Sequence, residues 1–345
     1  MSLDPIVLRG TLKETIWGGD HLATLLGKTL PPHTPIGESW ETALEAVATN
    51  PPYAGRTLGD LTNEFGVRLY GSRARAVFGD RFPLLIKFLD AHAWLSVQVH
   101  PDDVYAAEHE GGKLGKTEAW RILRTEPNAQ IMHGFSRATS RAEVEASIRT
   151  TQLKDFVHYE PVQAGDAVLN HAGTLHATGA GIVLYEVQEY SDVTYRIYDF
   201  GRVGTDGKPR ELHIPQALDV LEYDLLPRHK TQPIPLNGPQ GRLLVVCKHF
   251  ALAEVVPTPG TPVTRSTDGT SCQIVSVIEG QMRLTWGPPQ ALRSGVVGLG
   301  ETVVLPAEDA TYQLAAESDP ATRVLISWVP TSDDPAVAAW FAAQD

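Results

Sequence analysis

The chain has 345 residues, of which 42% are hydrophobic and 20% charged, and its formal net charge is -12. This acidic balance argues against nucleic acid and anionic membranes as partners, because both bind basic surfaces. The 30 glycines and 25 prolines favour short strands and many turns over long helices, so we expect a mainly β protein. The length suggests two domains.

The first residues and the cysteines bear on where the protein works. Residues 1–6 lack the basic and apolar stretches of a signal peptide, and no run approaches ~18 consecutive apolar residues. Cys247 and Cys272 lie in apolar surroundings, where we expect buried free thiols rather than a disulfide. We therefore expect a cytoplasmic protein that is neither secreted nor inserted in a membrane.

Two predicted elements, a helix and a strand, precede residue 95. Residues 58–65 have the spacing of a short peripheral helix, and residues 82–90 form an apolar, strand-like run that is interrupted by Lys87. Burying a lysine is unfavourable unless its charge is paired. Lys87 therefore either extends to solvent or faces a polar pocket where an anion binds.

Residues 95–100 alternate between apolar and polar side chains. In a strand this pattern places Gln98 and His100 on one face. A second strand-like run, residues 117–123, contributes Glu118. An imidazole, an amide oxygen and a carboxylate together suit a divalent metal ion, with Zn²⁺ favoured by nitrogen and Mn²⁺ or Mg²⁺ by oxygen.

The fourth candidate ligand is His176. It follows a turn at residues 172–174, and this layout places a histidine at the mouth of a barrel. His171, five residues earlier in the chain, is expected beside the site or at the surface. Between the strand-like runs at residues 95–100 and 117–123, residues 102–114 are polar and glycine-rich, which predicts a loop and a short helix over the site.

Further along the chain, residues 181–190 and 192–199 alternate like strands, and residues 141–148 and 215–221 have helical spacing. Asp192 and Arg196 are four residues apart and so share a strand face, where the simplest interpretation is a surface ion pair. Three prolines in residues 227–235 predict a linker, and a second set of strands follows over residues 241–330.

Several of these blocks occur together in one known family. In order along residues 10–220, the sequence resembles the type I mannose-6-phosphate isomerases (phosphomannose isomerases), which are metalloenzymes of the cupin superfamily. The blocks that carry the resemblance are residues 88–91, 95–103, 115–120, 172–177, 191–199 and 212–220. The chain departs from the family pattern at His171, where proline is usual, at Tyr190, where a small amide is common, and in the segment after Glu41.

The resemblance implies two cupin-type β-barrel (jelly-roll) domains with a few peripheral helices. We expect a catalytic metal-binding domain at residues 1–235 and a cupin-like domain without metal at residues 236–345. In the second domain, residues 300–312 are similar to a cupin's glycine-to-proline strand, and Tyr312 stands where a metal-binding histidine would be.

The resemblance also implies the activity, which is metal-dependent interconversion of mannose 6-phosphate and fructose 6-phosphate through an enediol. One Zn²⁺ per chain is expected, with other divalent metals possible. Arg196 is expected to stabilise the enediolate, and the base is either Lys116 or a metal-bound water. The expected metal ligands are Gln98, His100, Glu118 and His176, and the expected substrate-binding residues are Lys87, Ser96 and Asp192.

Two other functions are compatible with a metal-binding cupin. A metal-dependent dioxygenase would need open coordination sites and no cations for a phosphate, whereas this chain offers Lys87, Lys116 and Arg196. A sugar-binding or regulatory cupin without isomerase activity would retain the metal alone. We expect an isomerase that acts on a small phosphorylated sugar and is a monomer.

Overall fold

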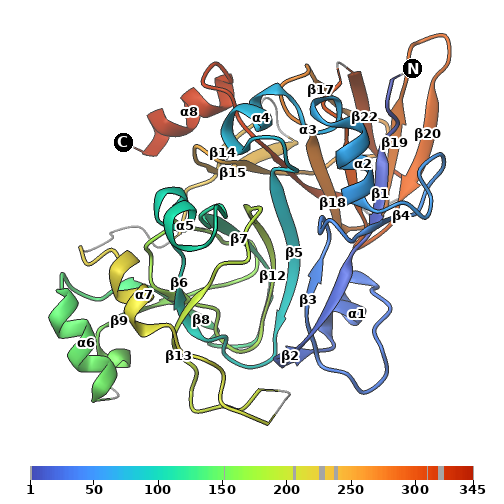
Figure 1. The fold of residues 1–345 in the computed structure, drawn as a ribbon. Helices are drawn as coiled ribbons and strands as arrows, with labels where there is room; N and C mark the ends of the chain where they lie inside the picture. Colours follow the sequence, from blue (N-terminus) through green and yellow to red (C-terminus); the bar gives the residue numbers. More distant parts are fainter. Residues whose placement is uncertain are drawn as a thin grey trace.

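The computed structural model describes residues 2–150, 152–204, 207–224, 230–236, 240–308, 310–317 and 322–344. The protein is mainly β and consists of two β-barrels of cupin type, as predicted (Figure 1). The predicted helices at residues 58–65, 141–148 and 215–221 are present as α2 (Leu58–Phe65), α6 (Arg141–Arg149) and α7 (Ile214–Val220). No helix in the described part of the chain is long and apolar enough to cross a membrane.

The N-terminal barrel is formed by two antiparallel sheets. The larger sheet has the order β10 (Ala167–Asn170), β7 (Glu118–Thr125), β12 (Ile182–Glu189), β5 (Leu84–Ala91), β3 (Ile36–Trp40) and β2 (Thr11–Gly19). The smaller sheet has the order β13 (Tyr195–Tyr198), β6 (Val97–Val99), β11 (His176–Ala177), β8 (Gln130–Phe135) and β9 (Val157–Pro161).

The C-terminal barrel also has two antiparallel sheets. The larger has the order β14 (Ile234–Pro235), β15 (Gly241–Val246), β16 (Ala251–Val255), β23 (Arg323–Trp328), β18 (Gln273–Glu279), β21 (Thr302–Leu305), β1 (Ile6–Arg9) and β4 (Val47–Ala48). The smaller has the order β17 (Val263–Thr267), β22 (Ala310–Ala316), β19 (Met282–Trp286) and β20 (Arg293–Val297). Two strands from the start of the chain thus complete a sheet of the second barrel.

Short helices cover the barrels. α2, α3 (Val67–Tyr70) and α4 (Ser72–Phe78) lie beside the C-terminal barrel, and α5 (Asp103–His109) lies above the N-terminal barrel (Figure 1). The others are α1 (His21–Leu26), α8 (Pro335–Gln344) and a 3-10 turn at Leu153–Asp155. Of the predicted linker, residues 225–229 lie outside the described residues, and Ile234–Pro235 pairs with β15 as strand β14.

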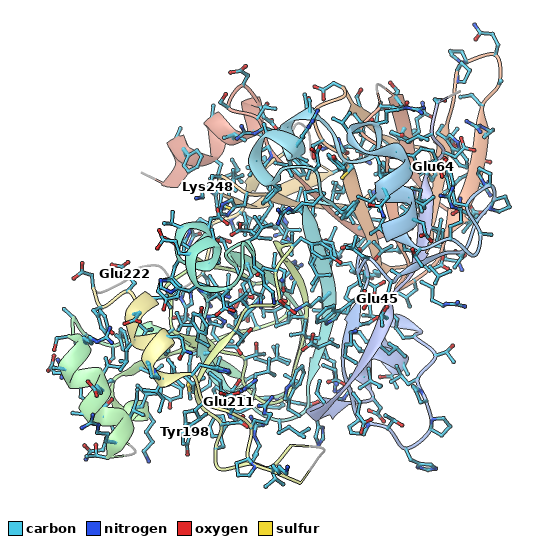
Figure 2. The ribbon with its side chains drawn as sticks, viewed as in Figure 1. Glu45, Glu64, Tyr198, Glu211, Glu222 and Lys248 are labelled. Carbon is cyan, nitrogen blue, oxygen red and sulfur yellow. The ribbon has the colours of Figure 1, made fainter. Side chains whose placement is uncertain are left out.

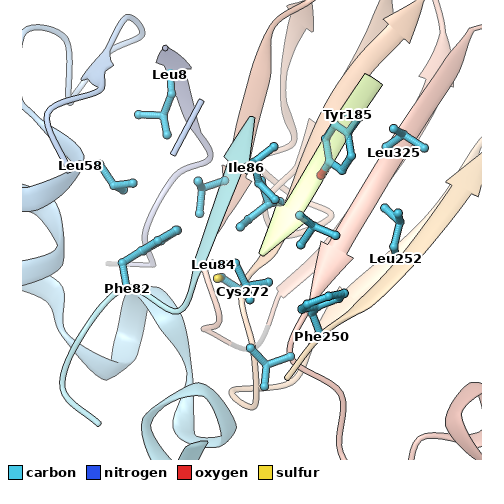
Figure 3. Packing of buried hydrophobic residues seen from close by; sticks show 14 of the residues in the cluster. Leu8, Leu58, Phe82, Leu84, Ile86, Tyr185, Phe250, Leu252, Cys272 and Leu325 are labelled. Carbon is cyan, nitrogen blue, oxygen red and sulfur yellow. The ribbon is translucent and has the colours of Figure 1, made fainter. Parts of the chain in front are cut away.

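Strands β5 and β12 are buried on both faces, which explains their nearly continuous apolar sequences. Outward side chains such as Ile86 and Tyr185 pack against Leu252 and Leu325 of the C-terminal barrel (Figure 3). The Tyr185 hydroxyl lies 2.9 Å from the Ser327 hydroxyl across this interface. Residues that alternate with these point into the N-terminal barrel, so the interface between the barrels also fixes the side chains that face the cavity.

The two barrels have the same strand connections. In the smaller sheets, β6-β11-β8-β9 corresponds to β17-β22-β19-β20. In the larger sheets, β10-β7-β12-β5-β3 corresponds to β21-β18-β23-β16-β15. The correspondence extends over both sheets, so positions in one barrel can be matched to positions in the other by their ladder partners.

Candidate metal centre and substrate cavity

Ladder pairing brings three of the predicted residues side by side. Gln98 on β6 pairs with His176 on β11 and with Arg196 on β13. The predicted strand at residues 192–199 begins only at Tyr195, because the Val193 carbonyl accepts a hydrogen bond from the His100 ring, 2.9 Å from Nδ1. The interruption therefore orients a predicted metal ligand instead of extending the sheet.

Two histidines and one carboxylate converge at the base of this sheet. Nε2 of His100 lies 3.3 Å from Oε2 of Glu118, and Nε2 of His176 lies 3.3 Å from Oε1 of the same residue. His100, His176 and Glu118 are all fully buried. Among the described residues Nε2 of His100 has no hydrogen-bond partner, and Oε2 of Glu118 has none besides its ion pair with Lys116. Buried polar atoms without partners are unfavourable, and a bound cation would satisfy them.

Backbone hydrogen bonds fix the tautomer of both rings. Nδ1 of His100 donates to the Val193 carbonyl, and Nδ1 of His176 donates to the Thr174 carbonyl, in both cases at 2.9 Å. A neutral ring that donates from Nδ1 presents a lone pair on Nε2. Both lone pairs consequently face the Glu118 carboxylate, which is the arrangement that a metal ion requires.

The charge states agree with a ligand set. Burial, assisted by the charge of Lys116, lowers the pKa of His100 to about 3, and burial also lowers the pKa of His176. Burial alone would raise the pKa of Glu118, but the Lys116 ammonium, 3.0 Å away, and the two histidines outweigh it and lower that pKa well below its usual value. At neutral pH the group therefore has neutral imidazoles beside an ionised carboxylate.

The side-chain amide of Gln98 lies beside the group formed by His100, His176 and Glu118. Nε2 of Gln98 lies 3.4 Å from Nε2 of His176, and the Ser96 hydroxyl donates to Oε1 of Gln98 at 3.3 Å. Coordination through the amide oxygen requires the amide to turn by about 180°. Ser96 can support either orientation, because a hydroxyl both donates and accepts.

A cavity of about 330 Å³ opens above this group. The residues predicted for catalysis and binding that line it are Lys87, Ser96, Gln98, Lys116, Asp192 and Arg196. His100, Glu118 and His176 lie buried beneath it. The structure therefore brings all of the predicted site residues to one region, with the histidine–carboxylate group at its base.

Lys87 faces this cavity rather than solvent. It is the cross-strand neighbour of Glu186, with Nζ 3.3 Å from Oε1 of that residue and 3.7 Å from Oε2 of Glu38. Burial opposes the charged form, but these carboxylates and Glu118 raise the pKa of Lys87 above its usual value. Lys87 also lies over the Trp40 ring, 4.7 Å from its centroid.

Arg196 does not form the surface ion pair that its spacing from Asp192 suggested. Asp192 pairs instead with Lys113, at 2.8 Å, and Arg196 donates from Nη1 to the Glu211 carbonyl at 2.8 Å. Tyr198 and Glu211 mark this edge of the N-terminal barrel in Figure 2. Nε of Arg196 is buried and has no hydrogen-bond partner among the described residues.

Sequence reasoning missed three charged residues of the cavity: Glu38, Glu186 and Arg210. Glu186 had a usable signal, because an acidic residue within the apolar run of residues 182–187 needs a buried partner. Arg210 had none, since it lies in an irregular segment after β13 and makes two hydrogen bonds to Asp199. Burial and the nearby Arg210 lower the pKa of Arg196.

A second group of ionisable side chains joins the barrels beside the site. Nδ1 of His249 lies 2.9 Å from Oε1 of Glu189, and its Nε2 lies 3.3 Å from Oδ2 of Asp103. Oε1 of Glu189 also accepts the Thr117 backbone N–H at 2.8 Å. Lys248, which precedes His249, lies between α5 and the C-terminal barrel in Figure 2. Both nitrogens of this ring face carboxylates, which is the environment of an imidazolium rather than of a metal ligand.

The fold and the site define a two-barrel cupin with a histidine–carboxylate centre in its first barrel. Comparison with known proteins identifies the family. Residues 6–125 match the family model described as phosphomannose isomerase type I, catalytic domain. The mannose-6-phosphate isomerase ManA of Bacillus subtilis is 36% identical over 292 residues, which cover 83% of this chain and 89% of that protein. The mannose-6-phosphate isomerase of Streptococcus mutans is 37% identical over 297 residues, or 85% of this chain and 90% of the relative.

Solved structures agree. The crystal structure of the mannose 6-phosphate isomerase from Bacillus subtilis superposes with a TM-score of 0.80 and 31% identity, covering 94% of this chain and 99% of that one. A putative mannosephosphate isomerase from Archaeoglobus fulgidus, at 20% identity, has the same fold with a TM-score of 0.75 over 96% of this chain and 100% of its own. This chain belongs to the type I phosphomannose isomerase family. The family is metal-dependent.

Proposed function

We propose that the cavity of the N-terminal barrel is where this chain interconverts mannose 6-phosphate and fructose 6-phosphate. Aldose–ketose isomerisation is the activity of the family to which the chain belongs. The observation that carries the assignment of the site is the convergence of His100, His176 and Glu118 beneath a polar cavity. The monomeric state and the cytoplasmic location are proposed with it; both cysteines are free and buried, which fits a reducing compartment.

The proposed cofactor is one Zn²⁺ held by His100, His176, Glu118 and Gln98. Two imidazole nitrogens, a carboxylate oxygen and an amide oxygen make a nitrogen and oxygen set that Zn²⁺ accepts. When bound, the ion supplies a Lewis acid that stabilises negative charge on the sugar oxygens. The backbone bonds of both histidine rings would hold the ligands in position for it.

The proton transfers are assigned to side chains that border the cavity. Isomerisation moves a proton between C1 and C2 of the sugar through an enediol, and the hydroxyl protons must move as well. Lys116 lines the cavity next to Glu118, so we propose that its Nζ, as the neutral amine, accepts a proton from the sugar and returns it from the resulting ammonium. Arg196 is permanently charged and planar, and we propose that it stabilises the enediolate.

Recognition of the phosphate is proposed for the cationic side of the cavity. Lys87 and Ser96 line it, but Lys87 is already paired with Glu186 and Glu38, and Ser96 supports Gln98. Arg210 lies in the same lining beside Arg196, so it is a third candidate for this contact. Asp192, which is exposed, is proposed to bind a sugar hydroxyl.

The test is an isomerase assay with mannose 6-phosphate on purified protein before chelation, after chelation and after Zn²⁺ is returned. We expect activity that chelation removes and Zn²⁺ restores. A metal-retaining protein without isomerase activity would support the regulatory cupin instead. Oxygen consumption in the same samples tests for dioxygenase activity, which no feature of the described site favours.

A further inference from the structure

A second cavity lies in the C-terminal barrel, and its lining includes Arg265 and Gln273, two of the residues that match metal-ligand positions of the first barrel. Its volume is about 290 Å³. Arg265 on β17 pairs with Tyr312 on β22, just as Gln98 on β6 pairs with His176 on β11. Gln273, the first residue of β18, pairs with Trp328 in the same way as Glu118, the first residue of β7, pairs with Gln188. The residues at the metal-ligand positions of this barrel are therefore Arg265, Thr267, Gln273 and Tyr312.

The guanidinium of Arg265 has few partners. Its Nε donates to Oε1 of Gln273 at 3.0 Å, and its Cζ lies 5.3 Å from the centroid of the Trp328 ring. Among the residues that the structure describes, no carboxylate lies within 4.0 Å of it and neither Nη atom makes a hydrogen bond. Burial lowers the pKa of Arg265, and the charge of Asp334, which does not pair with it, offsets this only in part. A half-buried guanidinium whose two-pronged end is free is a binding site for a planar oxyanion.

The rest of the cavity decides between kinds of anion. Its two acidic residues are already engaged: Asp268 accepts from the Thr270 backbone N–H, and Asp334 accepts from the Ala336 backbone N–H. Their charges repel a dianionic phosphate about twice as strongly as a monoanion, so a singly charged carboxylate is the better partner for the guanidinium of Arg265. The exposed hydroxyl-bearing side chains Thr264 and Ser266 also line the cavity and can bind the hydroxyls of a ligand.

We propose that the C-terminal barrel binds a small hydroxyl-rich carboxylate, of the sugar-acid or hydroxy-acid class, with its carboxylate on the guanidinium of Arg265. The cupin position that holds a metal ion in one barrel thus holds an anion in the other. The site is separate from the proposed isomerase cavity, and its occupancy does not depend on the metal.

The test is titration calorimetry on the full-length, metal-loaded protein with gluconate as the probe. Acetate, inorganic phosphate and glucose are the comparison ligands. We expect gluconate to bind and glucose, which lacks the carboxylate, not to bind. Acetate should bind more weakly because it lacks the hydroxyls. Arg265→Met should weaken gluconate binding by roughly tenfold to a hundredfold, the typical effect of losing a charged hydrogen-bond partner.

Two controls keep the outcome clear. Arg283→Met removes another arginine of the same barrel, which pairs with Glu317, and should leave gluconate binding unchanged. Arg265→Lys keeps the charge but not the fork, and should show an intermediate loss. Isomerase activity reports whether each variant is folded. Absence of gluconate binding to the folded wild type, equal binding by folded Arg265→Met, or binding of phosphate in preference to gluconate would each overturn the proposal.

Discussion

The two barrels share strand order and ladder register but differ in the side chains at their centres. Where the N-terminal barrel has His100, His176 and Glu118, the C-terminal barrel has Thr267, Tyr312 and Gln273. Each of the three C-terminal side chains has a partner or a charge state that disfavours metal binding. Thr267 donates to the Glu308 carbonyl, burial raises the pKa of Tyr312, and Gln273 accepts from Arg265.

The difference shows that the barrel determines where a site lies and the side chains determine what it binds. One matched strand position lines a cavity in both barrels, as Gln98 in the first and Arg265 in the second. One set of positions presents lone pairs, which suit a cation, and the other presents a guanidinium, which suits an anion. The two centres are therefore suited to ligands of opposite charge.

The strongest test of this contrast substitutes, one at a time, the residues at the matching ladder position of each barrel. His176→Ala should remove most of the bound metal and reduce turnover by at least about 100-fold, since a metal ligand is lost. Tyr312→Phe, at the matching C-terminal position, should leave metal content and turnover unchanged. Metal analysis and the isomerase assay measure both. A His176→Ala protein that keeps one metal per chain would remove this residue from the ligand set.

Substitution of Arg196 tests whether this residue of the first barrel's cavity is catalytic. Arg196→Ala should lower kcat on the order of 10²-fold, because a group that stabilises charge in the transition state is lost. Metal content and Tm should stay close to those of the wild type, because Arg196 forms no ion pair with a carboxylate among the described residues. If activity persists while Tm falls, Arg196 is structural, and Lys116 or Lys87 becomes the candidate for stabilising charge.

The smallest expected effect concerns the contact between the barrels at His249. Burial opposes the imidazolium, but hydrogen bonds to Asp103 and Glu189 outweigh it and raise the pKa of His249 above its usual 6.5. Its stabilisation is therefore complete below pH 6.5 and is lost as the pH rises through the folded-state pKa. His249→Asn should lower the free energy of unfolding by about 1–3 kcal/mol at pH 6 and by much less at pH 9.

Urea unfolding at the two pH values measures this difference. His109→Asn is the matched control, because His109 is exposed and lies 3.9 Å from Glu108 at the surface. A destabilisation by His249→Asn that is equal at pH 6 and pH 9 would mean that the neutral ring provides the contact.

Much of the site in the first barrel was predictable, because it depends on the alternation of apolar and polar side chains along single strands. Gln98 lies in β6 and His100 directly follows the end of that strand, so the shared face of these two residues follows from their spacing in the sequence. Glu118 and His176 fit as the first residues of strands β7 and β11. The family resemblance, which the comparisons confirm, supplied the activity that local patterns alone leave open.

Features that depend on pairing between distant strands were not predictable in this way. The Lys87–Glu186 pair needs the register of β5 against β12, and the partners of Arg265 need the register of β17, β18 and β23. No periodicity within one strand encodes either. The late start of the predicted strand, at Tyr195, likewise depends on a tertiary hydrogen bond, from His100 to the Val193 carbonyl.

Strand β1 has a consequence for how the chain is assembled. Ile6 pairs with Val304, so β1 finds its partner on β21 only after the strands of the N-terminal barrel and most of those of the C-terminal barrel have been made. The sheets of the N-terminal barrel contain no strand beyond β13 in the described structure, so they can form earlier. Until then, the apolar segment Ile6–Arg9 has an unsatisfied edge that can pair with other chains. The order of synthesis and the order of assembly therefore differ, because a strand that precedes the N-terminal barrel completes its sheet only when β21 of the other barrel is present.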